Sequence, residues 1–268
     1  MGGTIELPIW LFGLILVLSA ITFASHFLFP SVRWFLRRRA ERVVAKLNER
    51  LARPLEPFKL ARRYDTIQRL IYDPEVVEAV VAHAAKKGVR EDVAFQDARR
   101  YAQEIVPGFS AFTYFSFGIR AARWLAQMLY VVRTGPANRD VIAQLPEDAT
   151  VIFVMNHRSN MDYVLVTYLA GEDSALSYAV GEWARVWPLS RLIKNMGAYF
   201  IRRHSRGALY RTVLARYVDL ATRSGVTQAF FPEGGLSLDG HLAPPKMGLL
   251  SYAIETHRAG GARVVFVP

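Results

Sequence analysis

A histidine and an aspartate five residues apart are the side chains in this sequence best suited to acid–base chemistry. His157 and Asp162 belong to the run NHRSNMD at residues 156–162. An aspartate bonded to one imidazole nitrogen fixes the tautomer and leaves the other nitrogen as a base. Such a base can accept the proton of an alcohol whose oxygen attacks a carbonyl carbon. Taken alone, the pair also fits a structural histidine followed by a helix-capping aspartate.

The elements around this pair decide whether the two side chains can meet. Residues five apart on an ideal helix point about 140° away from each other, so His157 and Asp162 cannot share a helix face. The apolar run 151–155 predicts a strand that ends just before them. We therefore expect His157 on the loop after that strand and Asp162 on the first turn of the next helix. Sites in α/β sheets form at such junctions.

Short apolar runs alternate with amphipathic stretches along the last part of the chain. The predicted strands cover residues 151–155, 176–180, 198–201, 228–231 and 263–267, and the clearest helices cover 207–223 and 247–258. The alternation predicts an α/β domain over 148–268, with a mixed sheet flanked by helices. Because the sequence stops at Pro268 as the last predicted strand ends, we expect this domain to be truncated at its C-terminus.

The region 30–147 is predicted to be helical and to lie close to a membrane. Asp73 followed by Pro74 predicts the start of one helix, and Gly88 predicts its end. A further helix is predicted over 91–105.

An apolar stretch over 109–132 closes this region. Arg120 and Arg123 interrupt it, and two central arginines make a membrane-spanning helix costly. We expect this stretch to lie in the membrane interface or to pack on the globular domain.

The N-terminal residues 7–29 form a long apolar run, which predicts a transmembrane anchor. At about 1.5 Å per residue, such a run is long enough to cross a hydrocarbon core of about 30 Å. Arginines follow it at 33 and 37–39, and no Lys or Arg precedes it. The positive-inside rule then predicts a single-pass anchor with the catalytic domain on the cytoplasmic side. A cleaved signal peptide fits less well, because the basic leading region is missing.

Composition narrows the possible partners and cofactors. The 268 residues carry a formal net charge of +11, which favours anionic partners such as lipid head groups and phosphorylated substrates. No nucleic-acid-binding motif accompanies the charge, so we expect no nucleic-acid partner. The absence of cysteine excludes disulfides, thiolate metal sites and a cysteine nucleophile. The six histidines form no HxxxH or HxH pair, so we expect no metal and no cofactor.

Four ordered blocks carry a family resemblance across residues 156–268. The run from His157 to Asp162 resembles the HxxxxD motif of the glycerolipid acyltransferases. The blocks GAYFIRR at 197–203, FPEGGLS at 231–237 and VVFVP at 264–268 are similar to the second, third and fourth motifs of that family. The resemblance implies an acyltransferase with His157 and Asp162 at its catalytic centre.

Details of these blocks resemble the glycerol-3-phosphate acyltransferase branch. The resemblance implies that the arginines of the second block bind the phosphate of the acceptor, and the fork of Arg suits phosphate. It also implies that the glutamate of the third block organises the acceptor site. The run PPKMG at 244–248 resembles the same branch. The substrate-binding residues expected on this basis are Arg158, Ser159, Arg202, Arg203, Glu233, Gly234, Gly235 and Lys246.

The third block departs from the family pattern at two positions. Members carry Arg after the Glu-Gly-x run, and glycerol-3-phosphate enzymes often carry a second Arg two residues later. This sequence has Leu236 and Leu238 there. Lys246, Arg203 or His241 would have to compensate, or the acceptor is not glycerol 3-phosphate.

The sequence therefore predicts an O-acyltransferase of phospholipid synthesis at a membrane. It would move a fatty acyl group from acyl-CoA or acyl-carrier protein to glycerol 3-phosphate. Backbone N–H groups at the start of the helix after His157 are expected to stabilise the oxyanion. Two alternatives stay open: a lysophosphatidate or other lysolipid acyltransferase, and a catalytically weak, membrane-anchored binding protein.

Overall fold

The computed structural model describes most of the chain. It covers residues 8–133, 144–146, 148–171, 173–181, 184, 186–187, 189–202, 207–237 and 239–268, without the side chains of 23–33, 36–37, 40 and 189. The chain divides into two compact units, Met1–Glu49 and Arg50–Pro268, which are described separately.

The first unit consists of one long helix, α1, over Ile9–Asn48. Its described apolar side chains are mostly exposed, as at Leu14, Leu16 and Leu18. Among the residues that the structure describes, no helix is long and apolar enough to cross a membrane. The predicted anchor over 7–29 therefore has no support there. Residue 7 and the side chains of 23–29, which belong to that prediction, lie outside the described part.

The second unit is built on a five-stranded sheet in the order β3-β2-β4-β1-β5. Its strands are β1 (Ala149–Val154), β2 (Ser177–Val180), β3 (Tyr199–Phe200), β4 (Gln228–Phe230) and β5 (Arg263–Val267). They confirm the five predicted strands to within two residues at each end.

Every neighbouring pair of these strands is parallel, so the prediction of a mixed sheet was wrong. The physical reason is that a helix separates each strand from the next along the chain. A crossover of this kind returns the chain to the same end of the sheet.

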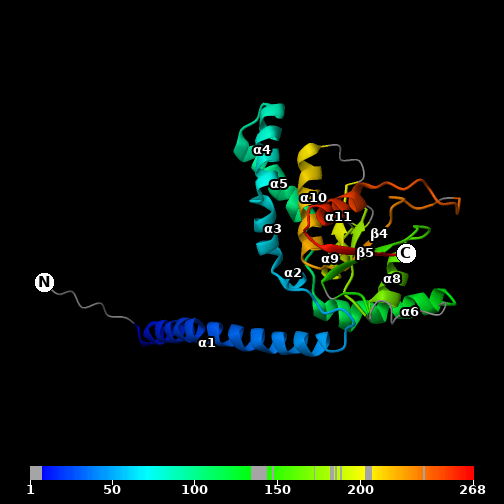
Figure 1. The fold of residues 1–268 in the computed structure, drawn as a ribbon. Coiled ribbons are helices and arrows are strands. Elements are labelled where there is room, and N and C mark those ends of the chain that lie inside the picture. The colour runs from blue at the N-terminus through cyan, green and yellow to red at the C-terminus, as the bar shows by residue number, and fades with distance from the viewer. Residues whose placement is uncertain are drawn as a thin grey trace. The chain divides into compact units, whose positions relative to one another are not determined.

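The parallel pairing places the loops that carry two predicted site residues side by side. β1 pairs with β4, with Phe153 opposite Ala229 and Val154 opposite Phe230. The loops that follow β1 and β4 therefore leave the same end of the sheet from adjacent strands (Figure 1). These loops carry His157 and Glu233.

The predicted helices of this unit are confirmed. They are α4 (Pro74–Lys87), α5 (Glu91–Ile105), α10 (Ala208–Arg223) and α11 (Gly248–Arg258). The Asp73 carboxylate accepts a hydrogen bond from the Glu75 amide at 3.1 Å, as an N-cap should. Such a cap contributes about 1 kcal/mol to helix stability. Gly88 ends α4 with φ of +63°, a conformation that favours glycine.

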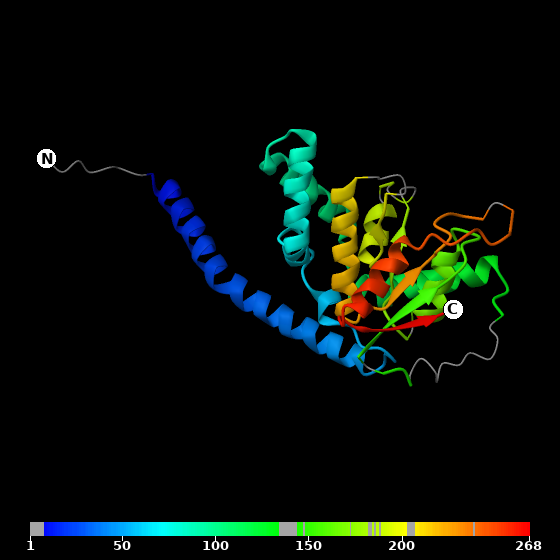
Figure 2. The ribbon, with the colours of Figure 1, turned by 45° about the horizontal axis from the view of Figure 1, so that its top comes forward.

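The helices before the sheet share one hydrophobic core with it. Buried side chains of α3 (Arg63–Ile71), α4 and α5 pack with those of α10 and the sheet, including Leu70, Ile105, Ile152 and Val213. Figures 1 and 2 both show α4 and α5 beside α10. The short helix α2 (Pro57–Leu60) precedes α3.

The apolar stretch predicted over 109–132 folds into a π-helical turn, η1 (Thr113–Gly118), and α6 (Ile119–Leu129). α6 lies against α8 (Asp162–Ala170), the helix that follows β1. Its buried side includes Ala122 and Ala126, while Trp124 and Met128 are exposed. The expectation that this stretch packs on the globular domain is therefore confirmed. A further helix, α9 (Leu189–Asn195), connects β2 to β3.

Candidate active site

His157 and Asp162 meet at the junction between β1 and α8. The His157 Nδ1 lies 3.0 Å from the Asp162 Oδ2. His157 is on the loop after β1, and Asp162 is the first residue of α8. This confirms the predicted arrangement, in which only the aspartate belongs to the helix.

The Asp162 carboxylate is held by three donors. Its Oδ2 also accepts hydrogen bonds from the backbone N–H groups of Arg158 and Ser159, each at 2.8 Å. An oxygen that already accepts two amide protons acts as a carboxylate acceptor toward the imidazole. His157 Nδ1 therefore carries a proton and donates it, which leaves the lone pair on Nε2.

The Nε2 atom of His157 has the character of a general base. The residue is 1% exposed, and its Nε2 has no hydrogen-bond partner among the residues that the structure describes. The imidazole packs against two rings, with centroid distances of 4.3 Å to Phe231 and 5.2 Å to Tyr163, and these two rings also contact each other. No described protein donor uses the Nε2 lone pair, so it can accept a substrate proton.

Glu233 fixes the backbone on which His157 sits. Its Oε1 accepts from the His157 N–H at 2.8 Å, and its Oε2 accepts from the Ala243 N–H at 3.1 Å. These two bonds, that of His157 first, lower the pKa of the Glu233 carboxyl, because they stabilise its charged form. Ser237 adds a third tie by donating its N–H to the His157 carbonyl at 2.8 Å. Glu233 therefore acts as a positioning residue in this geometry.

Lys246 lies across the glycine that follows Glu233. A Cβ atom at Gly234 would be 3.0 Å from the Lys246 Cδ and 3.7 Å from its Nζ. The Lys246 N–H donates to the Pro232 carbonyl at 2.7 Å, which fixes the backbone of the lysine. Gly234 has φ of +64° and no side chain, so it both permits the turn and leaves room for the lysine.

Gly235 and Leu236 continue this loop. Gly235 is half-buried, and Leu236, at the position where the resemblance implies an arginine, is partly exposed. Leu238 lies outside the described residues. The cation beside the third block, residues 231–237, is thus supplied by the Lys246 side chain.

Arg202 forms an ion pair with Glu104, a residue for which the sequence predicted no role. Its Nε donates to the Glu104 Oε2 at 2.8 Å, and its Nη2 donates to the other carboxylate oxygen. The hydrogen bond to Glu104 raises the pKa of Arg202. The guanidinium also lies over the Tyr101 ring, 5.2 Å from the centroid. Arg203, predicted beside it, lies outside the described residues.

The oxyanion donors predicted at the start of α8 are largely in use. The amides of Arg158 and Ser159 donate to Asp162, that of Met161 donates to the Ser159 Oγ, and that of Asp162 donates to the Ser159 carbonyl. Arg158 and Ser159, predicted to bind substrate, thus use their backbone N–H groups to hold the Asp162 carboxylate.

An apolar cavity of about 260 Å³ is linked to the histidine through Tyr163. Tyr163 belongs to its lining and also contacts the imidazole. The other walls come from η1, α6, α8, β2 and α9, from the loop before α8 and from the turn after α9. They include Phe117, Ala121, Leu125, Asn160, Leu192 and Met196. The sequence did not predict this cavity, because its walls come from segments that are far apart along the chain.

Metal ligation finds no support in the described part of the chain. No group of three or more His, Asp or Glu side chains there is arranged to hold a metal ion. The polar groups around His157 are instead occupied by one another, as described above.

Comparison with known proteins finds a family similarity over the part of the chain that holds this site. Residues 139–268, which contain His157, Asp162 and Glu233 with the geometry above, match the family model described as Acyltransferase. This part of the chain is similar to that family.

Two curated relatives extend the likeness beyond residues 139–268. The glycerol-3-phosphate acyltransferase of Aeromonas hydrophila is 31% identical over 214 residues, and that of Pasteurella multocida is 29% identical over 217. Each alignment covers 78% of this chain and 26% of the relative, so the chain spans about a quarter of the length of these relatives. Among solved structures, the 1-acyl-sn-glycerophosphate acyltransferase of Thermotoga maritima matches at 29% identity. That match covers 53% of this chain and 52% of the other, with a TM-score of 0.38.

Proposed function

We propose that this chain is an O-acyltransferase that transfers a fatty acyl group from a thioester to the hydroxyl of glycerol 3-phosphate, in phospholipid synthesis. The observation that carries the proposal is the buried His157, whose Nδ1 contacts Asp162 and whose Nε2 has no hydrogen-bond partner among the described residues. The family match over 139–268 and the names of both curated relatives support this reaction.

The reaction would proceed by direct attack. His157 Nε2 accepts the proton of the acceptor hydroxyl as its oxygen bonds to the thioester carbonyl carbon. The tetrahedral intermediate then collapses, the carbon–sulfur bond breaks, and the imidazolium returns the proton to the departing thiolate. Asp162 holds the tautomer and stabilises the transient imidazolium. The sequence holds no cysteine, so no acyl-cysteine intermediate forms.

The apolar cavity beside His157 would hold the fatty acyl chain. Its lining residue Tyr163 contacts the imidazole, so a chain in the cavity would place its carbonyl end near the base. Ala121 and Leu125 of α6 and Met196 after α9 would contact the methylene groups. Burial of each methylene group contributes about 0.8 kcal/mol to binding, which favours long chains.

Lys246 would hold the phosphate of the acceptor. Its ammonium lies beside Gly234, next to the glutamate that fixes the His157 backbone. An ammonium in that place supplies the charge that Leu236 does not. Arg202 is less available, because Glu104 accepts two of its hydrogen bonds.

A lysophosphatidate acceptor is the second candidate. The observation that favours it is the exposed leucine at 236 beside the cationic Lys246, since an apolar side chain there suits an acceptor that carries its own acyl chain. This acceptor also has a phosphate for Lys246, so the mechanism at His157 would be unchanged.

A thiol-release assay with a panel of acceptors tests the proposal. The wild-type chain is supplied with acyl-CoA, or with acyl-carrier protein, and with glycerol 3-phosphate, lysophosphatidate or no acceptor. Release that depends on glycerol 3-phosphate supports the lead, and release that depends on lysophosphatidate supports the second candidate. Absence of release with every donor and acceptor contradicts enzymatic function and favours a binding protein.

We further propose that the second unit works at a lipid surface. Apolar side chains of η1, α6 and the residues around them are exposed, among them Phe112, Phe117, Trp124, Met128 and Tyr130. Arg120 and Arg123 lie in the same segment and suit anionic head groups. The double variant Phe117→Ser/Trp124→Ser should co-sediment with anionic vesicles less than the wild type does. Equal co-sedimentation of the wild type and the double variant would contradict the proposed lipid surface. A cytoplasmic location stays a prediction.

A further inference from the structure

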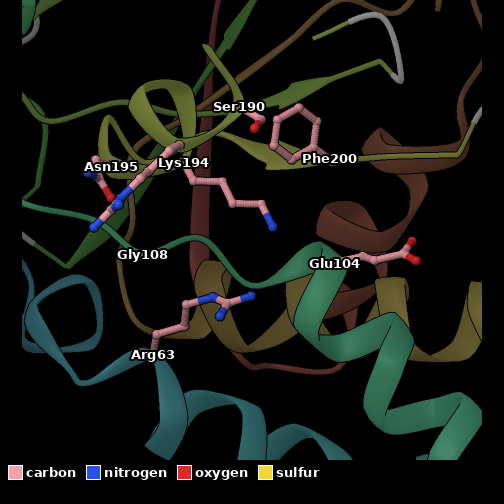
Figure 3. A pocket seen from close by; sticks show the side chains of 8 residues that line it. Arg63, Glu104, Gly108, Ser190, Lys194, Asn195 and Phe200 are labelled. Atoms are coloured by element: carbon pink, nitrogen blue, oxygen red, sulfur yellow. The ribbon is translucent and has the colours of Figure 1, made fainter. Parts of the chain in front are cut away.

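A second cavity, of about 410 Å³, lies on the other side of α9 from the apolar one. Its lining combines the start of α3, the end of α5, α9 and β3. The residues are Arg63, Glu104, Gly108, Ser190, Arg191, Lys194, Asn195 and Phe200. Figure 3 shows the side chains of Arg63 and Lys194 extending into the same space from opposite sides. Nothing in the proposed chemistry at His157 uses this cavity.

The charges of this cavity are mostly positive. Arg63, Arg191 and Lys194 contribute three cations to its lining. Glu104 is the carboxylate among the lining residues, and it forms an ion pair with Arg202, which does not belong to the lining. The lining therefore carries three cations and one carboxylate, and its net charge is positive. Concave surfaces with charge of one sign concentrate ligands of the opposite sign.

Two of these cations are held in place by the end of α5. Arg63 donates its Nε to the Val106 carbonyl at 2.9 Å and its Nη2 to the Gln103 carbonyl. The Lys194 Nζ lies 3.5 Å from the same Gln103 carbonyl. A guanidinium has five N–H donors, and Arg63 uses two of them in these bonds, so it retains donors for a ligand. Their geometry is fixed before any ligand arrives, which reduces the entropic cost of binding.

The polar neighbours suit a phosphate group. Ser190 and Asn195 add a hydroxyl and an amide to the cations of the lining. Phosphate oxygens accept several hydrogen bonds at once, and arginine binds them through two N–H groups. Arg191 is exposed, so a ligand can reach the cavity from solvent.

The position of the cavity relates it to the acyl donor. α9 separates the two cavities: Leu192 and Ile193 line the apolar one, and Arg191 and Lys194 line the cationic one. The cationic cavity adjoins Phe200 at the end of β3, and His157 follows β1, three strand positions away in the sheet. At about 4.8 Å per strand, that separation is roughly 14 Å. A ligand that spans it must carry its phosphate on a long arm.

We infer that this cationic cavity binds the phosphate groups of the phosphopantetheine arm of the acyl donor. The inference rests on the proposed function, because that function supplies the thioester donor. Coenzyme A and acyl-carrier protein both carry this arm, with the thioester at one end and phosphate at the other. The acyl chain then occupies one side of α9 and the anionic end of the donor occupies the other.

The test compares donor binding by two variants and one matched control. Arg191→Gln/Lys194→Met removes two charges from the cavity, and Arg191→Gln alone removes one charge from an exposed position. Arg69→Gln/Lys86→Met removes the same charge from exposed positions on α3 and α4. The dissociation constant for coenzyme A is measured by titration calorimetry. The KM for acyl-CoA and for acyl-carrier protein is measured with acceptor at saturation.

The double variant should weaken coenzyme A binding by roughly ten- to a hundredfold, and the single variant by several-fold. The kcat should stay near that of the wild type, and the control should bind as the wild type does. A KM that rises with acyl-CoA only places the nucleotide phosphates in the cavity, whereas a rise with both donors places the pantetheine phosphate there. Coenzyme A affinity and both KM values unchanged in the double variant would overturn the inference.

Failure of the proposed function gives a different result. In that case the wild-type chain releases no thiol with any acceptor. The coenzyme A titration still decides whether the cavity binds the arm, since it requires no turnover.

Discussion

The junction after β1 and the loop after β4 meet at one end of the sheet, but they are built in different ways. At the junction, the Asp162 carboxylate accepts three hydrogen bonds and Glu233 holds the His157 backbone. In the loop, Lys246 is exposed and is fixed through its backbone. Its ammonium has no ion-pair partner among the described residues. The base is therefore preorganised, while the cation is left for a ligand.

This difference separates two kinetic quantities. A residue that fixes the base acts on the transition state, so its loss lowers kcat. An exposed cation that binds phosphate equally in the ground state and the transition state acts on KM. The following substitutions test this separation, and for each we give the expected change in kcat or KM.

Asp162→Asn should have the largest effect among the residues that orient the base. An asparagine can still accept from the backbone amides, but it lacks the charge that holds the Nδ1–H tautomer of His157. We expect kcat to fall by roughly 10²- to 10⁴-fold, with little change in KM. Steady-state thiol release measures both quantities. A wild-type kcat in a folded Asp162→Asn protein would show that the tautomer does not matter.

Lys246→Met should raise the KM for the phosphorylated acceptor by roughly ten- to a hundredfold and leave kcat nearly unchanged. The methionine keeps the length and the packing over Gly234 but removes the charge. Lys86→Met, which removes a charge from the end of α4, is the matched control and should behave as the wild type. A fall in kcat without a change in KM would place Lys246 with the base and end the distinction between the two regions.

Glu233→Gln should lower kcat by roughly tenfold, because the neutral amide holds the His157 N–H less strongly. It should also change the dependence of stability on pH. The folded state lowers the pKa of Glu233 below its ordinary value of 4.5. The charged carboxylate therefore stabilises the folded state above pH 4.5, and this stabilisation is lost as the pH falls through the lowered pKa.

The melting temperatures of wild type and Glu233→Gln should accordingly differ most at neutral pH and converge in acid. A constant difference over the whole range would show that the charge of Glu233 does not stabilise the fold.

Ala121→Phe should have the smallest effect and should depend on the donor. The phenyl ring would fill part of the apolar cavity, which is about 260 Å³. We expect kcat/KM with a palmitoyl thioester to fall several-fold relative to that with a butanoyl thioester. An equal change with both donors would separate this cavity from the acyl chain.

The sequence predicted those features that depend on local chemistry. The Asp73 cap and Gly88 fixed the ends of α4, and the apolar run before His157 placed that residue on a loop at a strand end. The meeting of His157 with Asp162 followed from the same short segment.

Features made by distant segments were not predictable in this way. Glu233 reaches the His157 N–H because β4 pairs with β1, although β2 and β3 lie between them in the chain. The ion pair between Glu104 and Arg202 joins residues 98 positions apart. The parallel direction of every strand pair was also missed, since short apolar runs do not reveal strand direction.

The measurement that tests the central claim most directly is thiol release by His157→Ala, with the donor and acceptor that the wild type uses. The account predicts a fall in kcat of roughly 10²- to 10⁴-fold in a protein that still binds coenzyme A and melts cooperatively. Turnover near the wild-type rate in that variant would contradict the assignment of His157 as the base.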